Sequence, residues 1–374
     1  MALSKVDLAN QVENQLPQSL VADNVNFRNI IINGDMSIAQ RGTSASSVAS
    51  NGYHSCDRWR YAESSSAVVT ISQATDVPTG QGFAKSFKVD CTTADASLGA
   101  AEYVLLQQKI EGQNLQYLKK GTSSAESLTL SFWVKSTKTG TFIAMLYDRD
   151  NTRQIAKSYT VSSSDTWEKK TITFAGDTSG TLDNDNASSL ELWLWLGVGS
   201  NYSSGTLATS WETETAANQA VGQVNALDST SNNFLITGVQ LEAGTSASDF
   251  EFLPVDVNRY RCFRYCYRIN GNASDQQQCG AIGFANGGST LNAMMRFSPH
   301  MRTAPTVTED NMSQTTTGSA ISLTGTFDNT DTSDCNAAGL SFSADSGSPF
   351  TTGNVMFPRV NSSTSAFIQF DAEL

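Results

Sequence analysis

The sequence has little charge, little histidine and no long apolar run. Only 16% of its residues are charged, and the 374 residues include two histidines, His54 and His300. No apolar stretch reaches the roughly 18 residues that a membrane-spanning helix requires, and the HExxH, GxSxG and P-loop motifs are missing. These absences argue against membrane insertion and against histidine-dependent catalysis, so we expect neither an enzyme nor a cofactor.

Positive charge is scarcer than negative charge. The chain has 24 Lys and Arg residues against 36 Asp and Glu residues, which gives a formal net charge of -12. No Lys/Arg run interrupts this balance, so the chain lacks the electrostatic attraction through which proteins bind phosphate backbones. Nucleic acid is therefore excluded as a partner.

The cysteines are few and scattered, and the N-terminus has no signal peptide. Cys262 and Cys266 have helical i, i+4 spacing, but no second close pair completes a zinc site. No apolar segment with a cleavage signature follows Met1. We expect free, reduced thiols and a protein that is made and folded in a cytoplasm. The six cysteines are Cys56, Cys91, Cys262, Cys266, Cys279 and Cys335.

The first 26 residues predict a short helical anchor. Apolar residues follow one face of a helix over residues 3–16, and Pro17 ends it. An isolated helix of this length is marginal alone and needs a partner. We assign residues 1–26 to docking onto a larger particle, with four apolar candidates for the contact: Leu3, Val6, Val12 and Leu16.

Residues 27–256 predict an antiparallel β-sandwich, because apolar residues alternate with polar ones and glycine-containing turns separate the runs. The clearest runs are SLTLSFWVK at Ser127–Lys135 and LELWLWLGV at Leu190–Val198. Further expected strands are Val68–Ser72, Phe83–Val89, Thr141–Tyr147, Thr171–Phe174 and Phe234–Leu241.

The last third of the chain predicts a connector and a second, smaller β-sandwich. The arginine- and aromatic-rich stretch Val255–Ile269 breaks the period of two, and we assign residues 257–270 to a short helical or irregular connector. Residues 271–374 return to short strands, among them Ala320–Phe327, Leu340–Ala344 and Ala366–Leu374. The predicted fold class is all-β, with two sandwiches and a short N-terminal helical anchor.

Three motifs carry a resemblance to a known family. NIIINGDMSIAQRG at Asn29–Gly42 is followed by Asp57–Trp59 (DRW), and ITGVQLEAG at Ile236–Gly244 precedes Phe250–Pro254 (FEFLP). Together they resemble the domain of phage tail-fibre and minor structural proteins that is similar to jelly-roll carbohydrate-binding modules. Leu253 departs from the arginine that is usual in the closing motif.

Weaker similarity extends to the rest of the chain, in CFRY at Cys262–Tyr265, FSPHMRTAPTV at Phe297–Val307 and FDAEL at Phe370–Leu374. The resemblance implies a virion component that is commonly homotrimeric. It also implies that the sheet face opposite the aliphatic row of a jelly-roll module binds sugar.

Aromatic residues on that second face are the glycan-contact candidates: Trp133, Tyr147, Trp193 and Trp195. Sugar rings stack on exposed aromatic faces while neighbouring polar groups bind their hydroxyls. The alternative is that these rings are buried against a neighbouring subunit or under a loop.

Two further features have structural interpretations. Asp35 and Glu242 lie in the opening and closing motifs, where such modules can hold calcium; we favour Asp35 as the cap of a turn and assign no metal. The arginines of residues 259–268 suit charge-neutralising packing at a subunit axis in an acidic protein.

The predicted function is that of a bacteriophage fibre or appendage subunit, with a tail fibre favoured. Its N-terminus would attach to other virion proteins, and its β domains would bind host surface glycans with avidity from several copies. Two alternatives stay open. One is an architectural head fibre, capsid decoration or tail accessory protein without glycan binding, and the other is a polysaccharide depolymerase with paired carboxylates.

Overall fold

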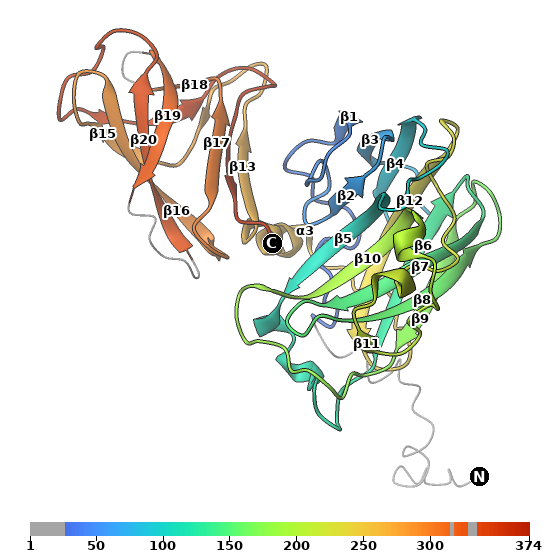
Figure 1. The fold of residues 1–374 in the computed structure, drawn as a ribbon. Coiled ribbons are helices and arrows are strands. Elements are labelled where there is room, and N and C mark those ends of the chain that lie inside the picture. The colour runs from blue at the N-terminus through green and yellow to red at the C-terminus, as the bar shows by residue number, and fades with distance from the viewer. Residues whose placement is uncertain (1–26, 315–317, 328–334) are drawn as a thin grey trace, which may run out of the picture.

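The computed structural model describes residues 27–314, 318–327 and 335–374 (Figure 1). The predicted N-terminal helix and its docking candidates Leu3, Val6, Val12 and Leu16 lie outside the described residues. The predicted all-β fold is confirmed, since 45% of the chain is strand and 6% is helical. None of the described helices combines the length and the apolar character needed to cross a bilayer.

The first domain is a sandwich of two six-stranded antiparallel sheets, here called sheet A and sheet B. Sheet A has the strand order β1 (Ser44–Val48), β3 (Val68–Ala74), β4 (Ser86–Thr93), β12 (Asn233–Ala243), β6 (Leu128–Ser136), β9 (Glu168–Phe174). Sheet B has the order β11 (Glu212–Thr213), β8 (Arg153–Val161), β7 (Gly140–Asp148), β10 (Ser188–Val198), β5 (Tyr103–Glu111), β2 (Arg60–Ser64).

The core of this sandwich lies where the alternation of apolar residues places it. Phe132 of β6 and Leu192 of β10 are fully buried between the sheets, as are the apolar residues two positions away on each strand. Because side chains alternate between the two faces of a strand, Trp133 and Trp193 then point to the outer faces of sheets A and B.

Two strands of sheet B, β5 and β8, escaped the prediction, and for β5 the reason is that its sequence does not alternate. β5 reads YVLLQQKIE and is buried at nearly every position, and β8 reads RQIAKSYTV. Both belong to sheet B, whose outer face is covered by residues between β10 and β12. A strand covered on both faces no longer needs a polar row.

The second domain is a smaller β-sandwich. A three-stranded sheet, β13 (Cys266–Asn270), β23 (Phe367–Asp371) and β17 (Thr306–Asp310), packs through a shared core on an eight-stranded sheet. The larger sheet has the order β14 (Gln277–Gln278), β22 (Pro358–Val360), β18 (Met312–Gln314), β19 (Ala320–Phe327), β20 (Cys335–Ala344), β16 (Thr290–Met301), β15 (Ile282–Ala285), β21 (Val355–Met356).

The connector is a helix followed at once by a strand. Helix α3 spans Val255–Phe263, and Cys266–Asn270, which we predicted as connector, forms β13 of the second domain. Figure 1 shows α3 between the two sandwiches, with the C-terminus beside it. Arg264 of this segment pairs with Glu111 of β5, so its charge is neutralised within the chain and not at a subunit axis.

Gly34, in the opening motif, lies against the closing motif. The Val239 amide donates to the Gly34 carbonyl at 2.9 Å, and a Cβ at Gly34 would lie 2.1 Å from the Val239 oxygen. We predict that Gly34→Ala lowers the free energy of unfolding by about 1–3 kcal/mol, the usual cost of overpacking. Gly325→Ala is the control, because a Cβ there meets no atom within 4 Å. Equal urea midpoints for the two variants would contradict the prediction.

Candidate functional site

The outer face of sheet B is closed. Residues between β10 and β12 cover it and form a second apolar cluster with the strands beneath. Trp195 is 1% exposed and Tyr147 is 5% exposed. Neither ring presents a free face, so these two glycan-contact candidates are corrected to core residues, because the covering loop occupies the position that a sugar would need.

Trp193 is half-buried in the same cluster. Its ring stacks on Tyr147 with centroids 5.2 Å apart, and its Nε1 donates to Glu191 at 2.7 Å. The Tyr147 hydroxyl donates to Glu214, which follows β11. These contacts match the alternative in which the aromatic residues of this face pack under a loop.

The outer face of sheet A holds an open groove of about 360 Å³ around Trp133. The indole is half-buried, and in the sheet Trp133 is paired with Thr237 of β12 and Lys169 of β9. Of the four predicted glycan-contact residues, Trp133 is the one that lines this groove.

Three phenylalanines pack on one another and line the groove beside Trp133. Phe83 lies with its ring centroid 5.1 Å from those of Phe250 and Phe252, and 51% of Phe252 is exposed. Gly238 makes room for this cluster: its φ is +62°, and a Cβ there would lie 2.5 Å from the Phe83 ring. Sequence reasoning missed these phenylalanines, although Phe250 and Phe252 stand in the closing motif.

Polar groups surround the aromatic surface. Gln81, Lys169 and Asp249 line the groove and are exposed, and none of their side chains has a hydrogen-bond or ion-pair partner among the described residues. Next to the groove, Lys135 bridges Asp76 at 2.9 Å and Asp165 at 3.1 Å. The groove therefore combines an aromatic surface with an amide, an ammonium and a carboxylate that are free to bind a polar ligand.

Asp35 and Glu242 do not come together as ligands. Asp35 accepts from the Ser37 amide and hydroxyl, which is the turn cap that we favoured, while Glu242 accepts from Ser248. Within the described ranges, no group of three or more His, Cys, Asp or Glu side chains is placed to hold a metal ion. All six cysteines are buried, and none of them forms a disulfide within the part of the chain that the structure describes.

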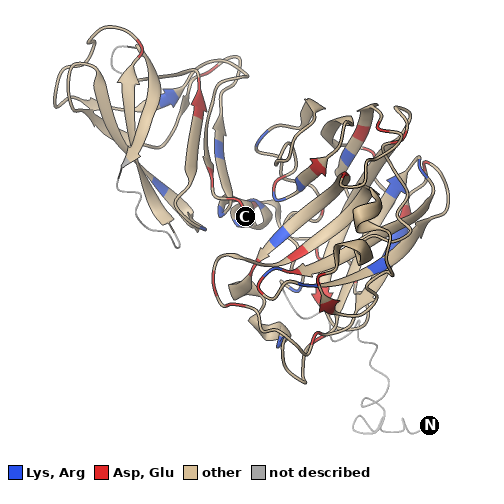
Figure 2. Ribbon diagram, viewed as in Figure 1, with Lys and Arg blue, Asp and Glu red and all other residues tan. Residues whose placement is uncertain are grey.

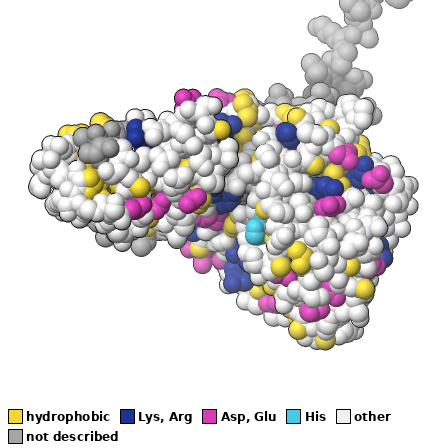
Figure 3. Space-filling model, turned by 90° about the horizontal axis from the view of Figure 1, so that it is seen from above, with side chains coloured by type: hydrophobic (Ala, Val, Ile, Leu, Met, Phe, Trp, Pro, Cys, Tyr) yellow, Lys and Arg dark blue, Asp and Glu magenta, His cyan; other side chains and the backbone are white. Residues whose placement is uncertain are grey.

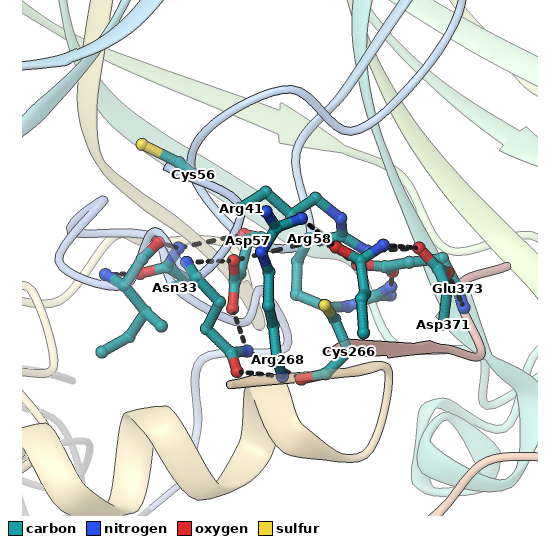
Figure 4. Close-up of polar contacts among 12 residues, drawn as sticks. Asn33, Arg41, Cys56, Asp57, Arg58, Cys266, Arg268, Asp371 and Glu373 are labelled. Carbon is teal, nitrogen blue, oxygen red and sulfur yellow. Dashed lines mark hydrogen bonds and ion pairs between the residues drawn. The ribbon is translucent and has the colours of Figure 1, made fainter. Parts of the chain in front are cut away.

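The remaining motif residues join the domains (Figure 4). Arg58 of the DRW motif is 1% exposed, pairs with Glu373 and stacks on Tyr265 with its Cζ 3.5 Å from the ring centroid. Arg41 pairs with Asp371 at 2.8 Å. These motif residues therefore form a buried structural contact between the two sandwiches.

Comparisons with known proteins find similarity in structure alone. No family model and no curated protein matches the sequence. The enzymatically active domain of tailspike protein 4 of bacteriophage CBA120 aligns with 14% identity and a TM-score of 0.33, covering 59% of this chain and 22% of that chain.

Carbohydrate-binding modules also align. A family 61 module in complex with β-1,4-galactotriose has 11% identity and a TM-score of 0.30, covering 58% of this chain and 99% of the module. The family 11 module from Clostridium thermocellum, in complex with a mixed-linked tetrasaccharide, has 13% identity and a TM-score of 0.28, covering 55% and 96%. Likenesses of this degree do not assign a function to the present chain.

Proposed function

We propose that this chain is a carbohydrate-binding structural protein that takes up glycan in the groove around Trp133. The observation that carries the proposal is the groove itself, in which an accessible aromatic surface is edged by polar side chains without protein partners. Its volume of about 360 Å³ is in the range of small-ligand pockets. On the face that Figure 3 shows, most of the surface belongs to uncharged polar side chains, glycine and backbone, with charged and hydrophobic side chains scattered among them.

The chemistry of the groove suits a sugar ring. The apolar C–H face of a pyranose packs on aromatic faces such as Trp133 and Phe252, while its hydroxyls need hydrogen-bond partners at the edge. Asp249 can accept from a hydroxyl, Lys169 can donate to one, and the Gln81 amide can do both. Contacts of this kind are weak singly, which suits a surface that is repeated in an assembly.

The setting that we propose for this activity is a bacteriophage particle. The opening, DRW and closing motifs resemble phage fibre proteins, and the proposal follows that resemblance in assigning a virion location, a homotrimer and attachment through residues 1–26. The glycan would then lie on the host surface.

An architectural role without glycan binding is the rival, and the binding experiment below decides between them. A depolymerase is less favoured, because glycosidases use two carboxylates and the described residues that line this groove include one, Asp249.

Trp133→Ala tests the site. We expect about ten- to a hundredfold weaker binding of a soluble oligosaccharide chosen from a glycan array, because burial of an aromatic side chain contributes on the order of 1.5–3 kcal/mol. Binding is measured by calorimetric titration, and thermal unfolding checks the fold. Trp167→Ala is the matched control: Trp167 is half-buried and donates to Asp76 at 2.9 Å but does not line the groove. Equal affinities of the two variants for the oligosaccharide would show that the glycan does not bind at Trp133.

A further inference from the structure

The second domain carries an apolar patch on the outside of its eight-stranded sheet. In the register of that sheet, Ile282 of β15 lies opposite Met294 of β16, and Phe284 of β15 lies opposite Val355 of β21. Residues opposite each other on neighbouring strands share a face, and so do residues two apart along one strand. Ile282, Phe284, Met294 and Val355 therefore form one continuous surface, here called the apolar patch.

All four side chains of the apolar patch are open to solvent in the single chain: Ile282 is 64% exposed, Val355 59%, Phe284 51% and Met294 45%. The alternate residues on the same strands, such as Ala285 and Met356, are buried in the core of the domain. Soluble monomers rarely expose large apolar side chains in a group, and such a group marks an interaction surface.

The strands around the apolar patch are uncharged over long stretches. No Asp, Glu, Lys or Arg occurs in residues 276–295, which contain β15, or in residues 346–358, which contain β21. β20 pairs with β16 and has no charged residue either, and Figure 2 shows β15 and β20 without charge. Along the outward row of β16, the first charge is Arg296, two residues after Met294.

This lack of carboxylates favours a second copy of the chain as the partner. Each copy has a net charge of -12, so two copies repel each other wherever their acidic surfaces meet. A neutral, apolar face avoids that repulsion, and in a symmetric assembly every copy presents the same face. A basic partner would instead be attracted to the acidic parts of the surface.

An open groove of about 670 Å³ adjoins the apolar patch. Ile282 and Met294 line it together with Tyr267 and Ile269 of β13, both half-buried, and the described lining residues include Arg296 but no carboxylate. The groove gives apolar side chains of a second copy a place to insert. Well-packed apolar groups of this kind form the centre of stable interfaces.

The neutral strands supply the polar rim that such an interface needs. A standard interface buries about 800 Å² on each partner, which is more than four side chains provide. Asn292 lies opposite Phe284 on one side and opposite Ser341 of β20 on the other, and Thr290 lies opposite Ser343. These side chains share the outer face with the apolar patch and can form hydrogen bonds across a contact without adding charge.

We infer that copies of this chain contact one another through the apolar patch of the second domain. The inference deepens the function proposed above: the number of copies, three, rests on that proposal, whereas the surface rests on Ile282, Phe284, Met294 and Val355. The groove around Trp133 lies on the first domain and is left available to glycan. Repeating that groove in one assembly supplies the avidity that weak sugar contacts require.

Val355→Glu in the full chain tests the surface, with Ile282→Glu as a second variant on the neighbouring strand. Each should weaken self-association by about a hundredfold or more, because a carboxylate without a partner would be buried at the contact. Sedimentation over a dilution series measures the mass, which should be a multiple of the monomer mass for the wild type and should fall towards the monomer mass for the variants.

Val255→Glu is the matched control. Val255 is also 59% exposed, but it lies at the start of α3 and not on the apolar patch. Its variant should sediment like the wild type. A wild type that is monomeric at micromolar concentration would overturn the inference and leave the apolar patch to a different protein. Variants of Val355 and Ile282 that both keep the wild-type mass at every dilution would overturn it as well.

Sugar binding keeps this inference separate from the proposed function. The groove around Trp133 shares no lining residue with the groove beside the apolar patch. The dissociated variants should therefore bind the array oligosaccharide with wild-type affinity per chain, which also shows that they are folded. Trp133→Ala should weaken the sugar and leave the mass unchanged. If neither the wild type nor the variants bind sugar while the variants dissociate, the glycan proposal fails and the contact surface stands.

Discussion

Replacing Glu373 with alanine is expected to lower the free energy of unfolding by about 3–5 kcal/mol, the usual effect of removing one partner of a buried ion pair. Glu373 pairs with Arg58 and lies 3.4 Å from Arg41, and the three side chains are 4%, 1% and 7% exposed. The truncation leaves the Arg58 guanidinium buried without its carboxylate. It also removes one of the contacts that tie the end of the second domain to the first.

Differential scanning calorimetry measures both the loss of stability and the loss of coupling between the domains. The wild type should unfold with the two sandwiches coupled, and Glu373→Ala should both lower the melting temperature and split the transition, because each domain has its own core. Glu126→Ala is the control, since Glu126 forms an ion pair of 2.7 Å with Lys119 in which both side chains are about half exposed (40% and 54%); such surface pairs contribute about 0–1 kcal/mol. A change below 1 kcal/mol for Glu373→Ala would mean that the domains are joined by other contacts.

Much of the fold follows from the pattern of apolar residues. Where a sheet face is open or lies on the core, as along β6, the alternation Leu130, Phe132, Val134 predicts both the strand and its buried face. Where a strand is covered on both sides, as β5 is, apolar and polar residues do not alternate, and the pattern does not identify the strand. The loop between β10 and β12 that covers this face is distant in sequence from β5. The residues near β5 therefore give no indication that the face is covered.

The candidate site could be predicted only in part, for the same reason. Trp133 and Trp195 both stand opposite an aliphatic row, and periodicity treats them alike. One lines an open groove and the other is 1% exposed under a loop. The phenylalanines beside Trp133 come from two segments some 170 residues apart, Phe83 on one side and Phe250 with Phe252 on the other. Only the folded chain brings them together.

The motifs illustrate a different limit. The DRW segment and the opening motif carried a resemblance to a family, but a resemblance alone does not say what their individual side chains do. In the structure Asp57 accepts from Gln40, Arg58 binds Glu373, and the Trp59 indole donates to the Asn33 carbonyl. The polar groups of this motif are therefore used in contacts within the protein at the junction of the two domains. Such a motif stabilises the fold and does not by itself indicate a ligand site.

Two adjacent lysines, Lys119 and Lys120, are alike in sequence and differ sharply in structure. Replacing Lys120 is the second change for which we expect a large loss of stability. Lys120 is 7% exposed, pairs with Asp148 and lies 3.0 Å from Asp177, whereas Lys119 is 54% exposed and pairs with Glu126 at the surface. Lys120 also donates to the Gly180 carbonyl at 2.9 Å. Its three donors are therefore used inside the protein, at positions that no local pattern distinguishes from those of its neighbour.

Lys120→Met is expected to lower the free energy of unfolding by about 3–5 kcal/mol, because Asp148, with no exposed surface, loses its cation. Lys119→Met should change it by less than about 0.5 kcal/mol. Urea unfolding at neutral pH measures both, and adding Asp148→Asn to Lys120→Met should recover part of the loss, since the unpaired carboxylate is then gone.

The acid dependence supplies an independent check. Burial acts to raise the pKa of Asp177, but hydrogen bonds from Arg153 and Lys120 outweigh it and hold the pKa below its usual value. The stabilisation from Asp177 is thus present above the pKa of an unfolded aspartate and is lost as the pH falls through the folded value. The difference between wild type and Lys120→Met should shrink in acid, and a difference that stays constant down to pH values well below that range would place the effect in packing of the lysine stem and not in charge.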